Sequence, residues 1–198
     1  RGREYRDRPT GRRFQPNAGD RVILQRVMLS NAILLRLRGV PTIYSGDEQG
    51  FVGKGGDQDA RQDMFPSKVA SYNDDRLLGT SATTAQSNFD TNHPLYREIA
   101  DLAHIRTAHP ALTRGLQLIR FSSDKPGLFA VSRFEPGTGR EMLLLFNTST
   151  APLQQNVEVE TRSKEFEVLA GECPLTAQAP GSVQVELPAL GYAVCNAR

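Results

Sequence analysis

The sequence of 198 residues contains no tryptophan, only three histidines and only two cysteines. Cys173 and Cys195 stand 22 residues apart and have neither the spacing of a zinc site nor that of a CxxC redox pair. The two cysteines could therefore be two buried free thiols or one disulfide, and the sequence leaves both alternatives open. No apolar run approaches the roughly 18 residues of a membrane-spanning helix, so we expect no membrane segment. The chain does not start with methionine and shows no targeting signal, which leaves its compartment undetermined.

The net charge of +2 is unevenly distributed. Residues 1–13 hold six arginines against Glu4 and Asp7, so this segment carries +4 and the rest of the chain −2. A basic arm can bind nucleic acid, but no aromatic-basic pattern or known module follows it. We therefore expect a solvated, arginine-rich loop and no nucleic-acid partner.

The first part of the chain has the pattern of a helix followed by a strand. Apolar positions in residues 20–38 recur at helical spacing, with Arg21, Gln25 and Arg36 on a polar stripe, which predicts a helix buried on most of its circumference. Asp20 suits its N-cap and Gly39 its end. The segment VPTIYS, residues 40–45, then predicts a short strand of a parallel sheet.

A second helix is predicted at residues 94–108, beginning at a proline. Residues 46–92, between the strand and this helix, lack periodicity and are rich in glycine and small polar residues. A loop of this length is uncommon in a compact domain unless it is functional, so it either forms a site or the element assignment is wrong. One strand and two helices make only a piece of a barrel.

After residue 112 the period changes to two, which predicts six or seven short antiparallel strands and a small β-sandwich. The candidate segments are GLQLIRFS, GLFAVSRFE, REMLLLFNTS, NVEVE, EFEVLA, SVQVELP and GYAVCNA. We therefore predict two domains, residues 1–112 and 113–198.

Carboxylates gather after the predicted strand. Tyr44 would project from its carboxyl end, and five acids follow in the loop: Asp47, Glu48, Asp57, Asp59 and Asp63. Ligands bind at this end of parallel strands, which favours a site. The alternative is that these acids pair with Arg61 and other basic residues or face water. The segment GGDQDARQD also makes calcium possible, although it lacks the spacing and the distal Glu of a helix-loop-helix calcium site.

The histidines are not expected to be catalytic. His93 stands at a helix start and His104 in a helix body, positions that are usually structural. No arrangement of a nucleophile with a histidine can be supported from spacing alone.

The segment GVPTIYSGDEQGF resembles the eighth-strand segment of the α-amylase family, which comprises glycoside hydrolases with a (β/α)8 barrel. The matching positions are Gly39, Pro41, Ile43, Tyr44, Gly46 and Glu48. Ser45 stands where the family often has a second tyrosine. The resemblance extends through GGDQDARQDMF, which is similar to a loop of bacterial α-amylase and pullulanase-like enzymes, to a final strand LPALGYAV. It covers nearly the whole chain from about residue 20.

The resemblance implies an α/β plus all-β fold, the C-terminal end of a (β/α)8 TIM barrel followed by a small antiparallel β-sandwich. It also implies retaining cleavage of α-1,4 or α-1,6 glucosidic bonds by an Asp, a Glu and a second Asp. In the family these follow the fourth, fifth and seventh strands, and hence should lie upstream of Arg1. The one Asn-His pair, Asn92-His93, is followed by Pro94 and cannot supply the last acid. The chain by itself should therefore be inactive.

Six residues are then candidates to bind an α-glucan or oligosaccharide: Tyr44, Asp47, Glu48, Phe51, Asp59 and Arg61. Each has a structural alternative, since Tyr44 can pack under the barrel rim, Arg61 can neutralise an acid and Phe51 can belong to the core. The expected partners are this substrate and the upstream barrel segment of the same protein. An extracellular or periplasmic location is plausible for the parent enzyme.

Other functions remain open at this point. A glucanotransferase or isomerase of the same family would use the same intermediate. Residues 113–198 could instead form a free-standing, noncatalytic carbohydrate-binding or scaffold module, although such modules usually present an exposed aromatic platform and the chain has no tryptophan. A complete protein that dimerises through its unpaired barrel strand is a third possibility.

Overall fold

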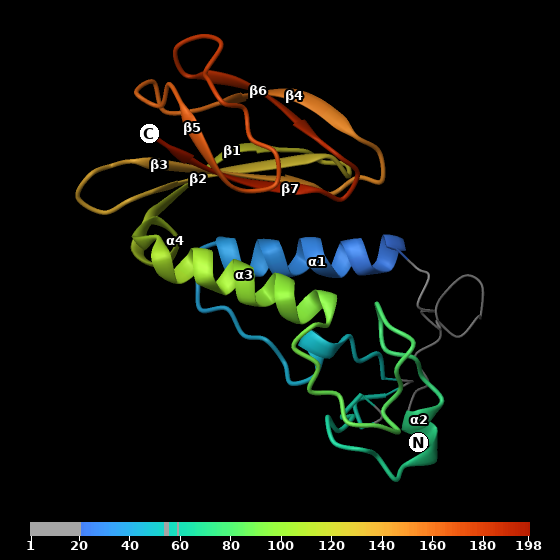
Figure 1. Ribbon diagram of the computed structural model, residues 1–198. Coiled ribbons are helices and arrows are strands. Elements are labelled where there is room, and N and C mark those ends of the chain that lie inside the picture. The colour runs from blue at the N-terminus through green and yellow to red at the C-terminus, as the bar shows by residue number, and fades with distance from the viewer. Residues whose placement is uncertain (1–20, 54–55, 59) are drawn as a thin grey trace. The chain divides into compact units, whose positions relative to one another are not determined.

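The computed structural model describes residues 21–53, 56–58 and 60–198 (Figure 1). The arginine-rich arm, the N-cap at Asp20 and the candidate Asp59 lie outside the described residues. The chain forms two compact units. The loop unit comprises the described residues up to Leu24 and Thr42–Ala100, and the sandwich unit comprises Gln25–Pro41 and Asp101–Arg198.

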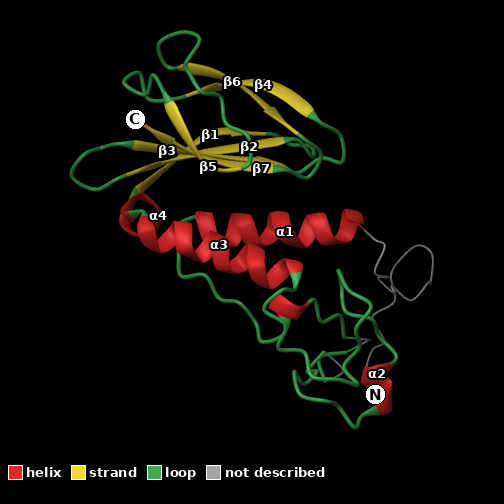
Figure 2. Cartoon of the chain, viewed as in Figure 1, coloured by secondary structure: helices red, strands yellow, loops and turns green. Residues whose placement is uncertain are grey.

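Both long helices predicted from periodicity are confirmed (Figure 2). Helix α1 spans Arg21–Arg36, and helix α3 spans Pro94–Ala108, with the proline in its first turn as expected. Three shorter helices lie between and after them: η1 (Asp47–Gln49), α2 (Ala70–Asn73) and α4 (Pro110–Arg114).

Helix α1 departs from the predicted burial pattern at a few positions. Arg36 was expected on the polar stripe, yet it is fully buried, while Val22 and Leu34 are 45% and 40% exposed. The cause is a tertiary contact, since the Arg36 Nη1 donates to the Leu102 carbonyl oxygen of α3 at 2.7 Å. The other predicted positions agree, since Arg21 and Gln25 are exposed, Leu35 is buried, and the remaining apolar positions are half-buried or buried.

All seven predicted strands are present, and they form two antiparallel sheets (Figure 2). The five-stranded sheet has the order β1-β2-β3-β7-β5, and the two-stranded sheet pairs β4 with β6. The strands are β1 (Leu116–Ser122), β2 (Leu128–Phe134), β3 (Glu141–Asn147), β4 (Leu153–Glu158), β5 (Phe166–Ala170), β6 (Ser182–Leu187) and β7 (Tyr192–Ala197). Leu143, Leu145, Val183, Val185 and Cys195 belong to the apolar core that both sheets share.

The central strand β3 is buried along its whole length, on both faces. Its uninterrupted apolar run, Met142–Phe146, is typical of such a strand. On the neighbouring strand β2, Arg133 is fully buried and donates to the carbonyl oxygens of Arg36, Leu112 and Gly115. The ends of α1 and α4 thus belong to the sandwich unit, which argues against residues 113–198 as a free-standing module.

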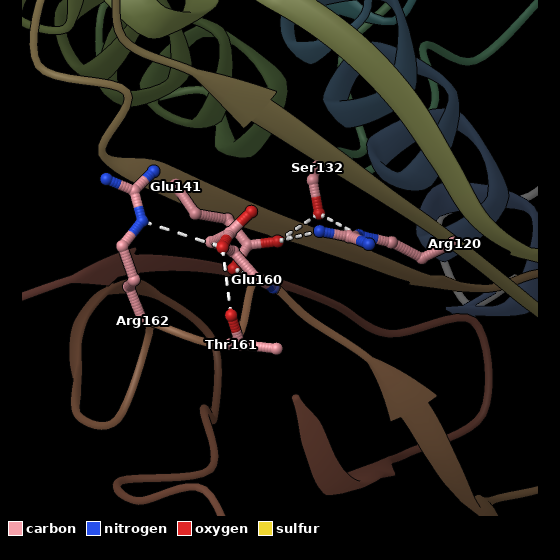
Figure 3. A network of polar contacts seen from close by, with 6 residues as sticks. All are labelled: Arg120, Ser132, Glu141, Glu160, Thr161 and Arg162. Carbon is pink, nitrogen blue, oxygen red and sulfur yellow. Dashed lines mark hydrogen bonds and ion pairs between the residues drawn. The ribbon is translucent and has the colours of Figure 1, made fainter. Parts of the chain in front are cut away.

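A buried polar network joins four segments of the sandwich unit (Figure 3). The Glu141 carboxylate on β3 accepts hydrogen bonds from Arg120 on β1 at 3.0 Å and from the Ser132 hydroxyl on β2. Its other oxygen accepts the backbone N–H of Glu160 at 2.9 Å. At the exposed end of the network, Arg162 pairs with the Glu160 carboxylate at 3.5 Å. Glu141 has partners on both oxygens and therefore acts as a structural acid.

The cysteines form a disulfide between Cys173 and Cys195, which settles the choice left open by their spacing. Cys195 lies on β7 and is fully buried in the core, whereas Cys173 lies in the loop between β5 and β6. The bond therefore ties this loop to β7, an inner strand of the five-stranded sheet.

The segment of residues 40–45 is extended but forms no ladder with any described strand, so the predicted strand is not formed here. A parallel strand requires a hydrogen-bonded neighbour, and no described segment supplies one. Val40 and Tyr44 are 91% and 60% exposed, as expected for an extended segment without neighbours. None of the described helices is long and apolar enough to cross a membrane.

Candidate functional site

Two of the candidate carboxylates turn back onto the chain just before them. The Asp47 Oδ2 accepts the backbone N–H of Tyr44 at 3.2 Å, and the Glu48 Oε2 accepts that of Gly46 at 2.9 Å. Burial raises the pKa of Asp47, and the neighbouring Glu48 carboxylate acts in the same direction, while the hydrogen bond from Tyr44 opposes both. Both acids thus shape the turn at the start of η1.

Glycine is required on both sides of η1. Gly46 and Gly50 have φ angles of 100° and 71°, in the left-handed region that favours glycine. A Cβ at Gly46 would stand 2.5 Å from the ring of Phe51, and one at Gly50 would stand 2.4 Å from the Leu78 carbonyl oxygen. The motif GDEQGF is therefore a tight turn, with the half-buried Phe51 ring packed against Gly46.

Tyr44 stands at the open edge of this turn and is 60% exposed. Because most of its surface is exposed among the described residues, Tyr44 is available for stacking or for a hydroxyl contact. Its neighbour Ser45 donates to the sulfur of Met64 at 3.7 Å, which links the turn to the far end of the acidic loop.

Arg61 pairs with Asp57, at 2.6 Å between the Arg61 Nη2 and the Asp57 Oδ2. Asp59 was predicted as a binding residue, whereas Asp57 was expected only as one of the loop acids. The signal that could have identified it is the spacing of four residues, which brings two side chains together on one helical turn. Both side chains are exposed, at 62% for Arg61 and 80% for Asp57, and together they present donors and acceptors to solvent.

The rest of the long loop is held together by polar side chains. Thr84, which is fully buried, donates to the Asn73 side chain at 2.8 Å, and the Asn73 amide donates to the Ser67 carbonyl oxygen at 3.0 Å. The Ser67 N–H in turn donates to the Thr84 carbonyl oxygen at 2.8 Å. This part of the loop is thus held in place despite its lack of periodicity, and the loop contains two short helices, η1 and α2, that the sequence pattern did not predict.

Further along the loop, Asn88 fixes one turn, since its amide donates to the carbonyl oxygens of Thr83 and Gln86. Its backbone N–H donates to the Met64 carbonyl oxygen at 2.8 Å, which brings two distant segments together. As a result, the exposed rings of Phe65 and Phe89 form an edge-on pair with 4.9 Å between their centroids.

A polar pocket of about 290 Å³ lies in the same unit. Residues from η1, from the segment 77–90 and from the start of α3 line it, including Gln49, Thr83, Ser87, Asp90 and His93. None of them was a candidate in the sequence, because they are ordinary polar loop residues that only the fold brings together.

His93 has a structural role, as expected. It is buried, its Nε2 lies 3.0 Å from the Leu78 carbonyl oxygen, and its Nδ1 accepts the backbone N–H of Leu95. The two contacts together require a neutral ring with its proton on Nε2. Burial lowers the pKa of His93 despite the opposing effect of that carbonyl and of Asp90 and Glu48.

The described residues contain no group of three or more side chains of the types that hold a metal ion. Calcium binding by the acidic loop, which includes Asp59, stays a prediction.

No family model matches the chain, but individual proteins do. The chain is 41% identical over 183 residues to an α-amylase from Streptomyces lividans, a match that covers 92% of this chain and 20% of that protein. A crystal structure of a debranching enzyme from Nostoc punctiforme superposes with a TM-score of 0.64 and 24% identity, over 87% of this chain and 31% of that one. An α-amylase from Anoxybacillus superposes with a TM-score of 0.65 and 19% identity, over 88% and 32%.

The structural matches confirm the predicted fold class, the C-terminal end of a (β/α)8 barrel followed by an antiparallel β-sandwich. The chain spans only about a fifth of the α-amylase and about a third of each structural relative. Over nearly all of its length the chain is thus similar in sequence to part of an α-amylase, and its resemblance to the α-amylase family of glycoside hydrolases is confirmed.

Proposed function

We propose that the chain is the C-terminal part of a retaining, α-glucan-active glycoside hydrolase that cleaves α-1,4 or α-1,6 bonds. The observation that carries this proposal is the 41% identity to an α-amylase over 92% of the chain. In the proposed enzyme the catalytic Asp, Glu and Asp belong to an upstream segment, and the present chain contributes binding contacts.

The geometry of the loop unit supports a binding role rather than a bond-breaking one. Retaining hydrolysis needs two carboxyl groups about 5 to 5.5 Å apart across the scissile bond, one of them free to attack the sugar. Asp47 and Glu48 accept backbone hydrogen bonds within their own turn, and Asp57 is paired with Arg61. None of these three carboxylates is therefore placed as a free nucleophile.

The proposed contacts divide by chemistry. Tyr44 offers an exposed aromatic ring, which suits the apolar face of a sugar. Arg61 and Asp57 offer a donor and an acceptor to sugar hydroxyls from one exposed ion pair. Asp47 and Glu48 hold the turn that positions Tyr44, with Phe51 packed behind Gly46. Asp59 remains a further candidate in the same loop.

The test is the activity of the enzyme encoded together with its upstream segment. We expect it to release sugars from maltooligosaccharides with the α-configuration retained, as followed by NMR. The substitution Tyr44→Ala should lower kcat/KM about tenfold, which corresponds to a loss of ~1.4 kcal/mol of transition-state stabilisation. The matched control is Tyr96→Ala, which removes an exposed tyrosine of helix α3.

A full-length enzyme that leaves every α-glucan intact would contradict the proposal. So would hydrolysis of starch by the 198-residue chain alone. Product analysis on maltoheptaose would separate hydrolysis from glucan transfer, since a transferase yields chains longer than the substrate.

A further inference from the structure

The polar pocket of the loop unit has a composition that limits what it can bind. Its volume of about 290 Å³ is near the lower end of small-molecule sites, which run from roughly 300 to 1,000 Å³. The residues that line it carry hydroxyls, amides, one carboxylate and one imidazole. They include no lysine, arginine or aromatic residue, and Leu77 and Ala82 are their only apolar side chains.

This composition excludes several ligand classes. An anion would meet no cation in the lining and would be repelled by Asp90. A metal ion would find a single carboxylate, and no cluster of metal-ligating groups occurs within the described residues. An apolar ligand would have to displace water from a mostly polar wall. A neutral molecule rich in hydroxyls, which can donate and accept at each position, fits best.

Two of the lining residues, Gln49 and His93, are fixed before any ligand arrives. The Gln49 side chain bonds reciprocally with the backbone of Asp90, donating to its carbonyl oxygen and accepting its N–H, both at 3.1 Å. His93 is held by Leu78 and Leu95 through both ring nitrogens, as described above. Side chains that are held in place in advance lower the entropic cost of binding.

Other lining residues keep free hydrogen-bonding capacity. Ser81, Gln86 and Ser87 make no side-chain hydrogen bond with another residue in the described part of the chain. Thr80 and Thr83 accept backbone N–H groups at 3.1 Å and 3.3 Å, and their own hydroxyl protons stay available to a ligand.

We propose that this pocket binds one glucosyl residue of an α-glucan, as a contact additional to the one around Tyr44. The inference rests on the proposed function, which supplies the class of sugar. The two places are connected, because Gln49 is the last residue of η1 and the turn at Tyr44 leads directly into that helix. The exposed Phe65 and Phe89 pair adjoins the pocket along the chain and offers an apolar surface for a neighbouring sugar ring.

The experiment uses the 198-residue chain, labelled with ¹⁵N and titrated with maltoheptaose. We expect saturable shifts of backbone amides in residues 80–90 and at Gln49. Ser87→Leu fills the pocket from an exposed position and should weaken the affinity about tenfold. Ser71→Leu, which makes the same change at an exposed serine outside the pocket, should leave the affinity within about twofold.

Unchanged binding by Ser87→Leu, or saturable shifts confined to residues outside the pocket, would overturn the proposal. The same shifts with a β-linked oligosaccharide such as cellohexaose, at equal affinity, would overturn its assignment to α-glucans. Thermal unfolding of both variants checks that each remains folded.

Failure of this inference can be told apart from failure of the proposed function. If the full-length enzyme cleaves α-glucans while Ser87→Leu binds maltoheptaose like the unmodified chain, only the pocket is misassigned. If maltoheptaose binds in the pocket but the full-length protein cleaves no α-glucan, the proposed hydrolase function fails and the binding site stands.

Discussion

Three charged arginine side chains are buried in the sandwich unit. Arg36, Arg106 and Arg133 all donate to backbone carbonyl oxygens, several of them at the end of α1, where Arg106 reaches Leu35, Leu37 and Gly39. Burial lowers the pKa of Arg36 to about 10, with nearby Arg106 adding to the effect and Tyr192 opposing it. The carbonyl groups at a helix C-terminus carry partial negative charge, which compensates part of this cost. Arg106 and Arg133 therefore satisfy carbonyl groups at the end of α1, whereas Arg36 donates to a carbonyl in the body of α3.

The buried His93 predicts a dependence of stability on pH. Burial lowers its pKa from 6.5, so the unfolded chain takes up this proton more readily than the folded one. The stability that the neutral, buried His93 contributes to the folded state is fully present above about pH 6.5. It is lost as the pH falls through the lower pKa of His93 in the folded chain. His109, whose pKa burial also lowers, acts in the same direction. We expect urea unfolding to show lower stability at pH 5.5 than at pH 7.5.

Replacing His93→Gln should make that difference smaller, because the glutamine does not titrate. His104→Gln, at an exposed position of α3, should leave it as in the unmodified chain. An identical pH difference in the His93→Gln variant would show that another group is responsible.

At the scale of elements, the sequence was most informative where a pattern repeats locally. The helices at Arg21–Arg36 and Pro94–Ala108 and all seven sandwich strands follow from periodicity and turn residues. The segment at residues 40–45 has strand composition but lacks a described partner, and a ladder depends on a neighbour that local pattern does not reveal.

Local sequence pattern also could not reveal the tertiary contacts that form the pocket and bury Arg36. Tyr44 could be singled out because it belongs to a recognisable motif. The pocket residues Gln49, Ser87 and Asp90 could not, because they are far apart in sequence and each is unremarkable alone. Arg36 falls on the polar stripe of α1 by periodicity, but its burial depends on the Leu102 carbonyl, 66 residues away.

The hydrogen-bond network around Glu141 joins strands β1, β2 and β3, and it depends on the charge of this one carboxylate. Glu141→Gln replaces an oxygen that accepts hydrogen bonds with an N–H₂ group facing a donor, in a site where Glu141 is fully buried and Arg120 nearly so. We expect a loss of about 3 kcal/mol in the free energy of unfolding, as for a broken buried pair. The measurement is urea unfolding at neutral pH.

The matched control for this prediction is Glu158→Gln on β4, where the side chain is exposed. It should change the stability by less than about 0.5 kcal/mol. Equal stability of the two variants would mean that the Glu141 network contributes little.

At the scale of the whole molecule, the disulfide should supply a measurable share of the stability. It closes a loop between residues 22 positions apart, for which chain entropy gives about 3 kcal/mol. We therefore expect a reducing agent to lower the urea midpoint of the unmodified protein. The double variant Cys173→Ala, Cys195→Ala should start from that lower midpoint and not respond to the reductant. An unmodified protein whose midpoint ignores the reductant would contradict the prediction.

The sandwich unit is assembled from two separate stretches, Gln25–Pro41 and Asp101–Arg198, with Thr42–Ala100 between them. It follows that no single cut can release it as one continuous peptide. A protease that nicks the long loop should leave both remnants associated, held by Arg36, Arg106 and Arg133 across the break. Removing the residues before 113 would instead uncover the second face of β3 and deprive Arg133 of two of its hydrogen-bond acceptors. A shortened form of the protein should therefore begin upstream of α1.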